Sequence, residues 1–214
     1  MVAIAAGVLL LAGGGTTPDE VVERFLHEIG GKNQRIVVLG QTREDPKRAQ
    51  SSVELLKEHG ATNVSLCDST TFDRHSLKAL EQDWASVRGF WVPGGDQEQF
   101  MTRFGRRWAR SYFQRRLSEG VVFFGTSAGS MICSDTMIAY SDHAGAPVLQ
   151  QGLGLTRLMI DTHYRERKRH SRLKSAFEQT LSASGAVGIE TGEWVVISGD
   201  RVIESHGTPE VFTR

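Results

Sequence analysis

This sequence of 214 residues has few cysteines and no excess of charge of either sign. Its two cysteines, Cys67 and Cys133, are too few for a disulfide framework and are not spaced as a metal-binding pair. Lys and Arg together number 25, as do Asp and Glu, so the formal net charge is zero. Proteins that bind nucleic acid without regard to its sequence usually carry a basic excess. We therefore expect neither a metal site nor a nucleic-acid partner.

Long hydrophobic runs are absent as well. No uninterrupted apolar stretch reaches the roughly 18 residues that a bilayer-spanning helix needs, so we expect no membrane partner. The apolar opening, residues 2–12, comes before the first basic residue, Arg24, whereas a secretion signal places basic residues ahead of its apolar segment. The opening also runs directly into three glycines and a helix start. We interpret it as a buried first strand of a cytoplasmic protein, with a secretion signal as the alternative.

What is present is the composition of an ordinary globular protein, with 39% apolar and 23% charged residues. The length suits one domain. We find no internal repeat, linker or low-complexity tract, so we expect a single domain over residues 1–214.

Short apolar runs alternate with segments of helical spacing through the first part of the chain. The runs that suit buried strands are residues 8–12, 36–39, 63–67, 89–92 and 121–124. The first predicted helix has Thr17 as its N-cap and Pro18 at its first position. Near the end, residues 194–197 and 201–204 flank Ser-Gly-Asp, which predicts a β-hairpin. The sequence therefore predicts the α/β class, with a doubly wound, mostly parallel sheet and a C-terminal β-hairpin.

A nucleophile motif follows the fifth apolar run, where residues 125–130 read Gly-Thr-Ser-Ala-Gly-Ser. A sharp turn from strand to helix requires small residues, and Gly125 and Gly129 flank Ser127 at the spacing that such a turn needs. The turn would place the Ser127 hydroxyl at the carboxyl end of the sheet, before a helix N-terminus that favours negative charge. A glycine-rich turn that only connects a strand to a helix is the alternative interpretation.

A second loop of small residues, Pro-Gly-Gly-Asp-Gln at residues 93–97, follows the fourth apolar run. Loops at the carboxyl ends of parallel strands converge on one edge of the sheet. The backbone N–H groups of Gly95 and Ala128 are therefore candidates for an oxyanion hole. An ordinary tight turn would have the same composition.

A serine nucleophile needs a base, and His163 is the best placed of the seven histidines. It follows the apolar residues 158–160 and Asp161, so we expect it just beyond the end of a strand. A basic run continues after it, and guanidinium groups suit carboxylates. A second basic stretch, residues 103–116, holds six arginines among aromatic residues, and we interpret it as a surface helix.

Together these motifs resemble the cyanophycinases of serine peptidase family S51, which also contains the aspartyl dipeptidases. The resemblance rests on the loop at residues 93–97, the turn at residues 125–130 and the run Asp-x-His-Tyr-x-x-Arg-x-Arg-x-x-Arg-Leu that starts at Asp161. It extends from Gly13 to residues 188–190. It implies a fold related to the class I glutamine amidotransferases, a homodimer, and a Ser-His-acid triad that works without a cofactor.

Carried over to this chain, the resemblance gives Ser127 as the nucleophile and His163 as the base. It gives a substrate pocket formed by Gln97, Asp161, Arg167, Arg169 and Arg172. The chain departs from the cyanophycinases at Thr162, where they have Gln, and this departure leaves the substrate preference open.

The acid of the triad lies between the serine and the histidine in this family. Asp142 matches the family's spacing best, so we expect it to orient His163. Asp135 falls within the predicted helix after the turn, and Asp161 resembles a pocket residue. Glu190, which follows a late strand, is the second choice.

The resulting hypothesis is a serine hydrolase that cuts amide bonds at aspartyl residues, with cyanophycin as its expected substrate and β-Asp-Arg dipeptides as its products. One alternative is an aspartyl dipeptidase of the same family, and another is a catalytically silent homologue that binds a ligand. An esterase of the α/β-hydrolase type shares the order serine, acid, histidine. It would carry an HGGG-type oxyanion loop, which this sequence lacks. Its catalytic histidine would normally lie near the C-terminus, farther along the chain than His163.

Overall fold

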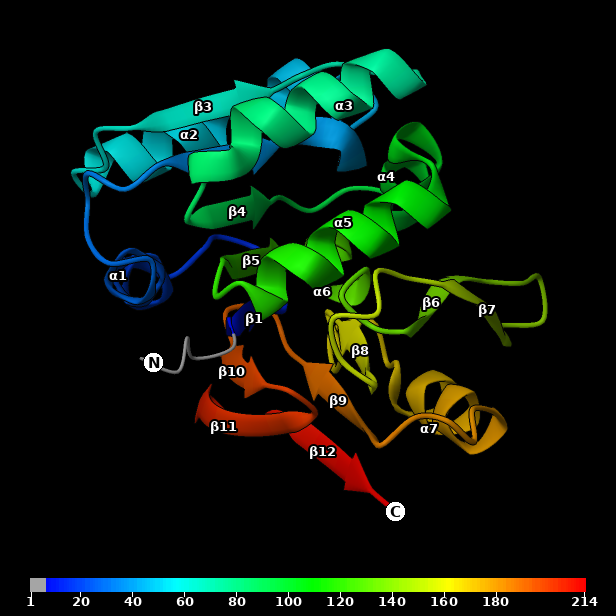
Figure 1. Cartoon of the computed structure of the whole chain (residues 1–214). Helices are drawn as coiled ribbons and strands as arrows, with labels where there is room; N and C mark the ends of the chain where they lie inside the picture. The colour runs from blue at the N-terminus through cyan, green and yellow to red at the C-terminus, as the bar shows by residue number, and fades with distance from the viewer. Residues whose placement is uncertain (1–6) are drawn as a thin grey trace, which may run out of the picture.

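A seven-stranded sheet forms the centre of the computed structural model, which describes residues 7–214 (Figure 1). The strands lie in the order β11-β10-β1-β5-β4-β2-β3. The five strands from β1 to β3 in this order are parallel, and β10 and β11 extend the sheet antiparallel at the β1 side. Their bounds are β1 Leu9–Ala12, β2 Ile36–Leu39, β3 Val64–Cys67, β4 Gly89–Val92, β5 Val122–Thr126, β10 Trp194–Ser198 and β11 Arg201–His206. The question of a secretion signal falls partly on residues 1–6, outside the described residues.

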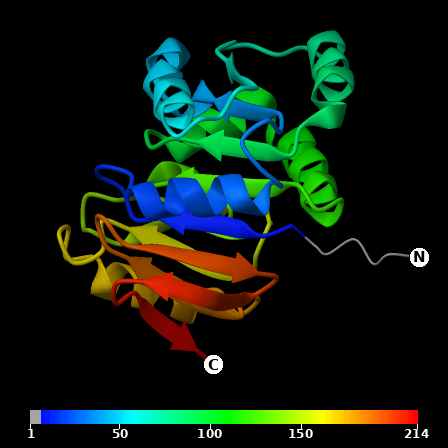
Figure 2. The same ribbon diagram turned by 90° about the vertical axis from the view of Figure 1, so that its left-hand side faces the viewer.

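Both faces of the inner strands of this sheet are buried because these strands, β1, β2, β4, β5 and β10, are almost entirely apolar. Leu9 and Leu11 of β1 point to one hydrophobic cluster, whereas Leu10 and Ala12 point to another. Helices α1 (Asp19–Glu28) and α2 (Gln50–Glu58) pack on the Leu10 side, and α3 (Arg74–Asp83), α4 (Gln97–Phe104) and α5 (Arg106–Ser118) pack on the Leu9 side. Short 3-10 helices join these layers: η1 Gly40–Thr42, η2 Pro46–Ala49 and η3 Trp84–Ser86. Figure 2 shows α2 and α3 at the end of the molecule opposite the C-terminal strands.

A second group of elements adjoins the carboxyl ends of the central strands. After the four-residue helix α6 (Ala128–Met131), strands β6 (Thr136–Ser141) and β7 (Pro147–Gln151) form an antiparallel hairpin. Strands β8 (Leu158–Thr162), β9 (Gly185–Ile189) and β12 (Glu210–Thr213) form a small sheet in the order β12-β9-β8, and α7 (His170–Gln179) packs against it. Because β8 and β9 are parallel and Thr162 pairs with Ile189, the residues that follow the two strands emerge side by side.

The predicted α/β class is confirmed, as are the doubly wound, mostly parallel sheet and the C-terminal hairpin of β10 and β11. The predicted cap of the first helix is wrong: Pro18 occupies the N-cap position with extended backbone angles, and no side chain caps the helix. The predicted helix after the serine turn is much shorter than expected. Asp135 therefore lies beyond α6, just before β6.

Candidate active site

Ser127 stands at the sharp turn between β5 and α6. Its backbone angles, φ 53° and ψ −116°, lie in a region that a non-glycine residue adopts only when its surroundings enforce it. The surroundings here are close: a β-carbon on Gly125 would overlap the backbone of Gly129, and one on Gly129 would overlap the backbone of Val92. The Ser127 N–H also donates to Ala12 O at 3.0 Å, which ties the turn to the end of β1. This packing holds the Ser127 hydroxyl at the carboxyl edge of the sheet.

His163 lies next to Ser127, with 3.1 Å between its Nε2 and the serine Oγ. It is the first residue after β8, and its positive φ of 50° turns the ring toward the end of β1. There the backbone N–H of His163 donates to Gly13 O at 3.0 Å. Gly14 lies so close that a β-carbon on it would overlap the imidazole ring. The Gly14 φ of +114° independently favours glycine. The sequence-predicted pair of Ser127 and His163 is thus brought into hydrogen-bonding contact.

The other ring nitrogen of His163 faces two polar side chains. Its Nδ1 lies 3.0 Å from Thr191 Oγ1 and 3.3 Å from Glu166 Oε2. Thr191 Oγ1 in turn donates to Glu166 Oε2 at 2.5 Å. The hydrogen bond from Thr191, followed by that from His163, lowers the pKa of the Glu166 carboxyl. The imidazole therefore stands between a serine hydroxyl and an ionised carboxylate.

Glu190, the second choice for the acid, supports this loop from beneath and does not contact His163. Its Oε2 accepts from the backbone N–H groups of Arg165 and Glu166, and its Oε1 accepts from that of Thr191 at 2.7 Å. Burial acts to raise the pKa of Glu190, but these backbone donors outweigh it and the pKa is lowered. The Glu190 carboxylate thereby fixes the two segments that carry Glu166 and Thr191.

Asp142, the sequence-predicted acid, is not near the imidazole, and that expectation is corrected. Asp142 lies in the exposed turn between β6 and β7, where its Oδ1 accepts from the N–H groups of Ala144 and Ala146 at 2.9 Å each. A carboxylate is common at this position because it stabilises a tight turn through local backbone contacts. Asp135 is also engaged elsewhere, in an ion pair with Arg110 at 2.6 Å.

The candidate oxyanion donors, the N–H groups of Gly95 and Ala128, belong to residues that line one cavity together with Ser127. Gly94 packs against Ser127, since a β-carbon there would lie 3.1 Å from that of Ser127. The N–H groups of Gly95 and Ala128 make no hydrogen bond to any described residue. Gly95 has a φ of +151° and leaves no room for a side chain, because a β-carbon would overlap Thr42 O. Two free backbone donors therefore adjoin the serine.

A cavity of about 650 Å³ opens beside Ser127. Arg167, Arg169 and Arg172 contribute to its lining, as does the start of α4. The residues that line it are Gly95, Asp96, Gln97, Glu98, Ser127, Ala128, Met131, Ala139, Tyr140, Ser141, Arg167, Arg169 and Arg172. The cavity thus presents a cationic wall within the same hollow as the serine.

Asp161 does not line this cavity, which corrects its expected contact with substrate. It is fully buried, and its carboxylate holds the two arginines: Oδ1 accepts from Arg169 at 3.1 Å and also from Arg172, while Oδ2 accepts from Arg172 Nε at 2.9 Å. Burial lowers the pKa of Arg169, and the charge of Asp161 opposes this effect. Thr162 is equally buried, so its side chain also stays outside the cavity.

Gln97 does line the cavity, with its amide orientation fixed by the protein. Its Nε2 donates to Ile138 O at 3.0 Å and to Ala139 O at 2.5 Å. The Oε1 atom accepts no hydrogen bond from a described residue. This geometry leaves Gln97 with an acceptor for a ligand and removes the donor that a free amide would offer.

Sequence reasoning missed Glu166, Thr191 and Gly14. Glu166 stands three residues after His163 within the basic run, and this spacing was an available signal for a nearby partner. Thr191 follows β9, and only the parallel pairing of β8 with β9 brings it to the imidazole. Gly14 belongs to the glycine-rich end of β1, whose contact with His163 depends on the tertiary fold.

Within residues 7–214, no group of three His, Cys, Asp or Glu side chains gathers in a way that could hold a metal ion. Across the same residues, no helix combines the length and the apolar composition required to span a bilayer.

Comparisons with known proteins show the family of the chain and agree with its fold. The family model described as Peptidase family S51 matches residues 8–205. Among solved structures, a peptidase from an acI-B1 Actinobacterium superposes with a TM-score of 0.65 at 17% identity, covering 99% of this chain and 89% of that one. A protein assigned as a peptidase E from Listeria monocytogenes EGD-e superposes with a TM-score of 0.66 at 16% identity, covering 98% of this chain and all of that one. The comparison with curated proteins found no match.

Proposed function

Because the chain belongs to peptidase family S51, we propose that it hydrolyses amide bonds at aspartyl residues with Ser127 as its nucleophile. The observation that carries this proposal is the contact of 3.1 Å between Ser127 Oγ and His163 Nε2, at the rim of a cavity with an arginine wall. A serine at a strained turn next to an imidazole fits nucleophilic catalysis, and carboxylate-binding guanidinium groups fit an acidic substrate.

In the proposed first step, Ser127 Oγ attacks the substrate carbonyl carbon while His163 Nε2 accepts the hydroxyl proton. The carbonyl oxygen becomes an oxyanion, which the free N–H groups of Gly95 and Ala128 stabilise. His163 then gives its proton to the leaving amine, and the C–N bond breaks to leave an acyl group on Ser127. The same imidazole then deprotonates a water molecule, whose oxygen attacks the acyl carbon. The bond from that carbon to Ser127 Oγ breaks, the imidazolium returns its proton to Oγ, and the carboxylic acid product leaves.

Glu166 takes the place of Asp142 as the acid in this proposal, with Thr191 between it and the ring. Because Thr191 Oγ1 donates its own proton to Glu166, its lone pairs are free to accept from His163 Nδ1–H. This holds the tautomer in which Nε2 is a base. The lowered pKa of Glu166 keeps its charge in place while His163 becomes an imidazolium.

Glu166→Gln is expected to lower kcat at least about tenfold, because the charge that stabilises the imidazolium is lost. Thr191→Val removes the bridging hydroxyl with little change in shape and is also expected to lower kcat at least about tenfold. The double variant should have a kcat no lower than that of the more severe single variant. Steady-state kinetics on one substrate checks this, and KM should change less than kcat.

Asp142→Asn is the matched control, since an asparagine Oδ1 can accept both hydrogen bonds of the turn. It should keep kcat within twofold of the unchanged protein. If Asp142→Asn instead lowers kcat more than Glu166→Gln does, the role proposed for Glu166 is wrong.

The arginine wall indicates what the substrate carries next to the scissile bond. Arg169 and Arg172 are held by buried Asp161, and Arg167 forms no ion pair with a described residue. Arginines fixed in this way present their remaining N–H groups to the cavity as pre-positioned carboxylate donors. We assign them to the free carboxylates of an aspartyl substrate, and Gln97 Oε1 to an N–H group of the same molecule.

Cyanophycin is one candidate within this class, and it additionally requires an acceptor for its arginine guanidinium. Asp161 cannot serve, because its carboxylate is already taken by Arg169 and Arg172. Asp96 and Glu98 also line the cavity, but Glu98 is already paired with Arg106. Asp96 is exposed, and among the described residues its Oδ1 accepts only from the backbone N–H groups of Glu98 and Gln99, so Asp96 is the acceptor that we assign to the guanidinium. A β-Asp-Arg unit would therefore lie across the cavity, with its carboxylates toward the arginines and its guanidinium toward α4.

Mass analysis of products from cyanophycin and from a panel of Asp-X dipeptides tests the substrate class directly. We expect cleavage at aspartyl residues in at least one of the two sets. Arg167→Ala should raise KM about tenfold or more, because a carboxylate partner is lost, while labelling of Ser127 by a small phosphonate is unchanged. Arg48→Ala, an exposed arginine of η2 outside the cavity, is the control. Cleavage beside Asp, Leu and Lys at equal rates would contradict the aspartyl assignment.

A further inference from the structure

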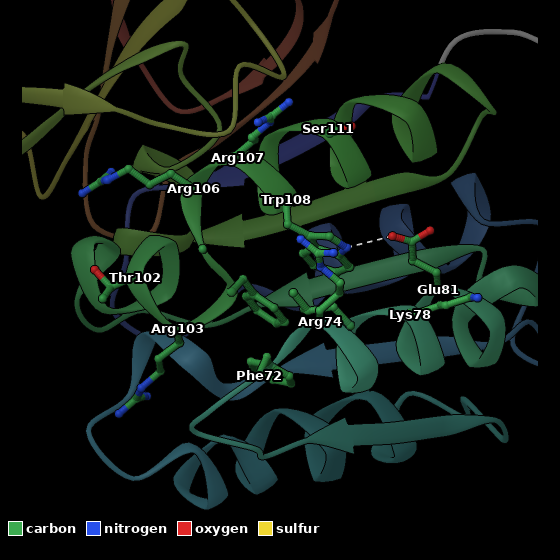
Figure 3. Close-up of a pocket in the computed structure, with 13 residues that line it drawn as sticks. Phe72, Arg74, Lys78, Glu81, Thr102, Arg103, Arg106, Arg107, Trp108 and Ser111 are labelled. Carbon is green, nitrogen blue, oxygen red and sulfur yellow. Dashed lines mark hydrogen bonds between the residues drawn. The ribbon is translucent and has the colours of Figure 1, made fainter.

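A second cavity, of about 750 Å³, lies between α3 and the junction of α4 with α5 (Figure 3). We call it the α3–α5 groove. Its lining residues are Phe72, Arg74, Leu77, Lys78, Glu81, Thr102, Arg103, Phe104, Gly105, Arg106, Arg107, Trp108 and Ser111. It includes the start of the arginine-rich stretch at residues 103–116, which the chemistry proposed at Ser127 does not use.

The floor of the groove is aromatic. Phe72 stacks on Phe104 with 4.5 Å between ring centroids, and Trp108 stacks between Phe104 and Tyr112 at 5.6 and 4.8 Å. Phe72 and Trp108 are only half-buried, so part of each ring faces the groove. The indole N–H of Trp108 is already satisfied by Glu81 at 2.8 Å, which leaves the exposed ring surface apolar (Figure 3).

The rim is cationic, and part of its charge is uncompensated. Arg103 donates to the backbone carbonyls of Gln41, Arg43 and Glu44, and Arg106 pairs with Glu98. Arg74, Lys78 and Arg107 are exposed and form no ion pair with a described residue. The one acidic lining residue, Glu81, is engaged by Trp108 and Arg115. A protein with no formal net charge therefore concentrates free positive charge around one apolar groove.

Helix α4 connects this groove to the cavity at Ser127. Its first turn, with Gln97 and Glu98, lines the cavity, and its last turn lines the groove. The ion pair of Glu98 with Arg106 joins the two linings directly. Eight helical residues span about 12 Å, a distance that an extended peptide covers in about four residues.

We propose that the α3–α5 groove binds the distal part of an extended acidic peptide whose aspartyl end lies at Ser127. This inference rests on the proposed function and adds a preference for substrate length. Uncompensated cations around an apolar aromatic floor are complementary to carboxylates next to an aromatic or aliphatic side chain. The groove then lowers KM for long acidic peptides and has no effect on dipeptides, which end before they reach it.

The test compares two substrates with the same scissile bond. One is an Asp-Leu dipeptide, and the other is an octapeptide that begins with Asp-Leu, continues with two glycines and ends in Glu-Phe-Glu-Glu. The variant is Arg74→Glu with Lys78→Glu, two exposed α3 residues four apart and hence on one helix face. The matched control is Lys57→Glu with Arg201→Glu, which reverses two exposed charges on α2 and β11.

We expect the groove variant to raise KM for the octapeptide at least tenfold and to leave kcat unchanged. Its kcat/KM for the dipeptide should stay within twofold of the unchanged protein. The control variant should stay within twofold in kcat/KM for both the dipeptide and the octapeptide. An equal change for both substrates, or none for either, overturns the proposal.

A binding measurement keeps this result separate from the proposed function. Fluorescence anisotropy of the labelled octapeptide is measured with Ser127→Ala protein, with and without the groove substitutions. If the unchanged protein cleaves neither peptide, the proposed function fails. The Kd of the octapeptide then still tests whether the groove binds it. A Kd at least tenfold weaker in the groove variant and unchanged in the control supports it, whereas equal Kd values for all three proteins overturn it.

Discussion

Replacing Ser127 by alanine is expected to lower kcat about 10⁴- to 10⁶-fold and to abolish labelling by a fluorophosphonate. The substitution removes only the hydroxyl group, whose oxygen lies 3.1 Å from His163 Nε2. The residues of a triad act as a unit, so removing the nucleophile alone removes nearly all of the covalent pathway. The turn itself should persist, because alanine keeps the β-carbon and the N–H donor to Ala12 O. Labelling followed by mass analysis of the modified peptide measures the effect.

The neighbouring serine provides the control for this experiment. Ser130 is fully buried in the same turn, with its Oγ 2.7 Å from Ala12 O and 2.8 Å from Gly125 O. Ser130→Ala should cost about 1 kcal/mol of stability and still be labelled at Ser127. Retention of a tenth of the activity by Ser127→Ala would show that another nucleophile acts. A folded, unchanged protein that is never labelled would favour the catalytically silent ligand-binding homologue.

The second large effect is expected at Asp161, where Asp161→Asn should lower the free energy of unfolding by about 3 kcal/mol or more. Asp161 is 0% exposed, and among residues 7–214 it carries the only carboxylate in contact with the largely buried Arg169 and Arg172. An asparagine presents one acceptor and one donor to two guanidinium groups, so one buried positive charge loses its partner. Removing one member of a buried ion pair costs about 3–5 kcal/mol. Urea unfolding followed by circular dichroism measures this loss.

The same variant should raise KM for an acidic substrate at least tenfold, because the arginines are no longer held toward the cavity. Asp83→Asn is the matched control. Asp83 also accepts two hydrogen bonds from an arginine, Arg35, but its side chain is 60% exposed. A pair at the surface contributes less than about 1 kcal/mol, so this control should be nearly neutral in both measurements. Equal losses of stability in the two variants would show that Asp161 does not act as a buried clamp.

The sequence alone determined the fold class and the position of the serine turn. Strands that are apolar at every position can only be buried on both faces, and helical segments between them require a parallel sheet. Gly125 and Gly129 around Ser127 are also local information, because the turn admits no side chain at either place. His163 could be chosen from its place after an apolar run. All of these inferences depend on neighbours in the chain.

The tertiary structure decided which groups surround His163 and what Asp161 does. Thr191 lies 28 residues from His163 in the sequence and reaches it only because β8 and β9 pair in parallel with Thr162 opposite Ile189. Asp142 has the spacing expected of the acid, yet the β6–β7 hairpin directs it into its own turn. Spacing along a chain does not define direction in space, and the orientation of a hairpin or the register of two strands is set by long-range pairing. For the same reason Asp161, part of a motif read as substrate-binding, is enclosed by the fold and instead positions the arginines that line the cavity.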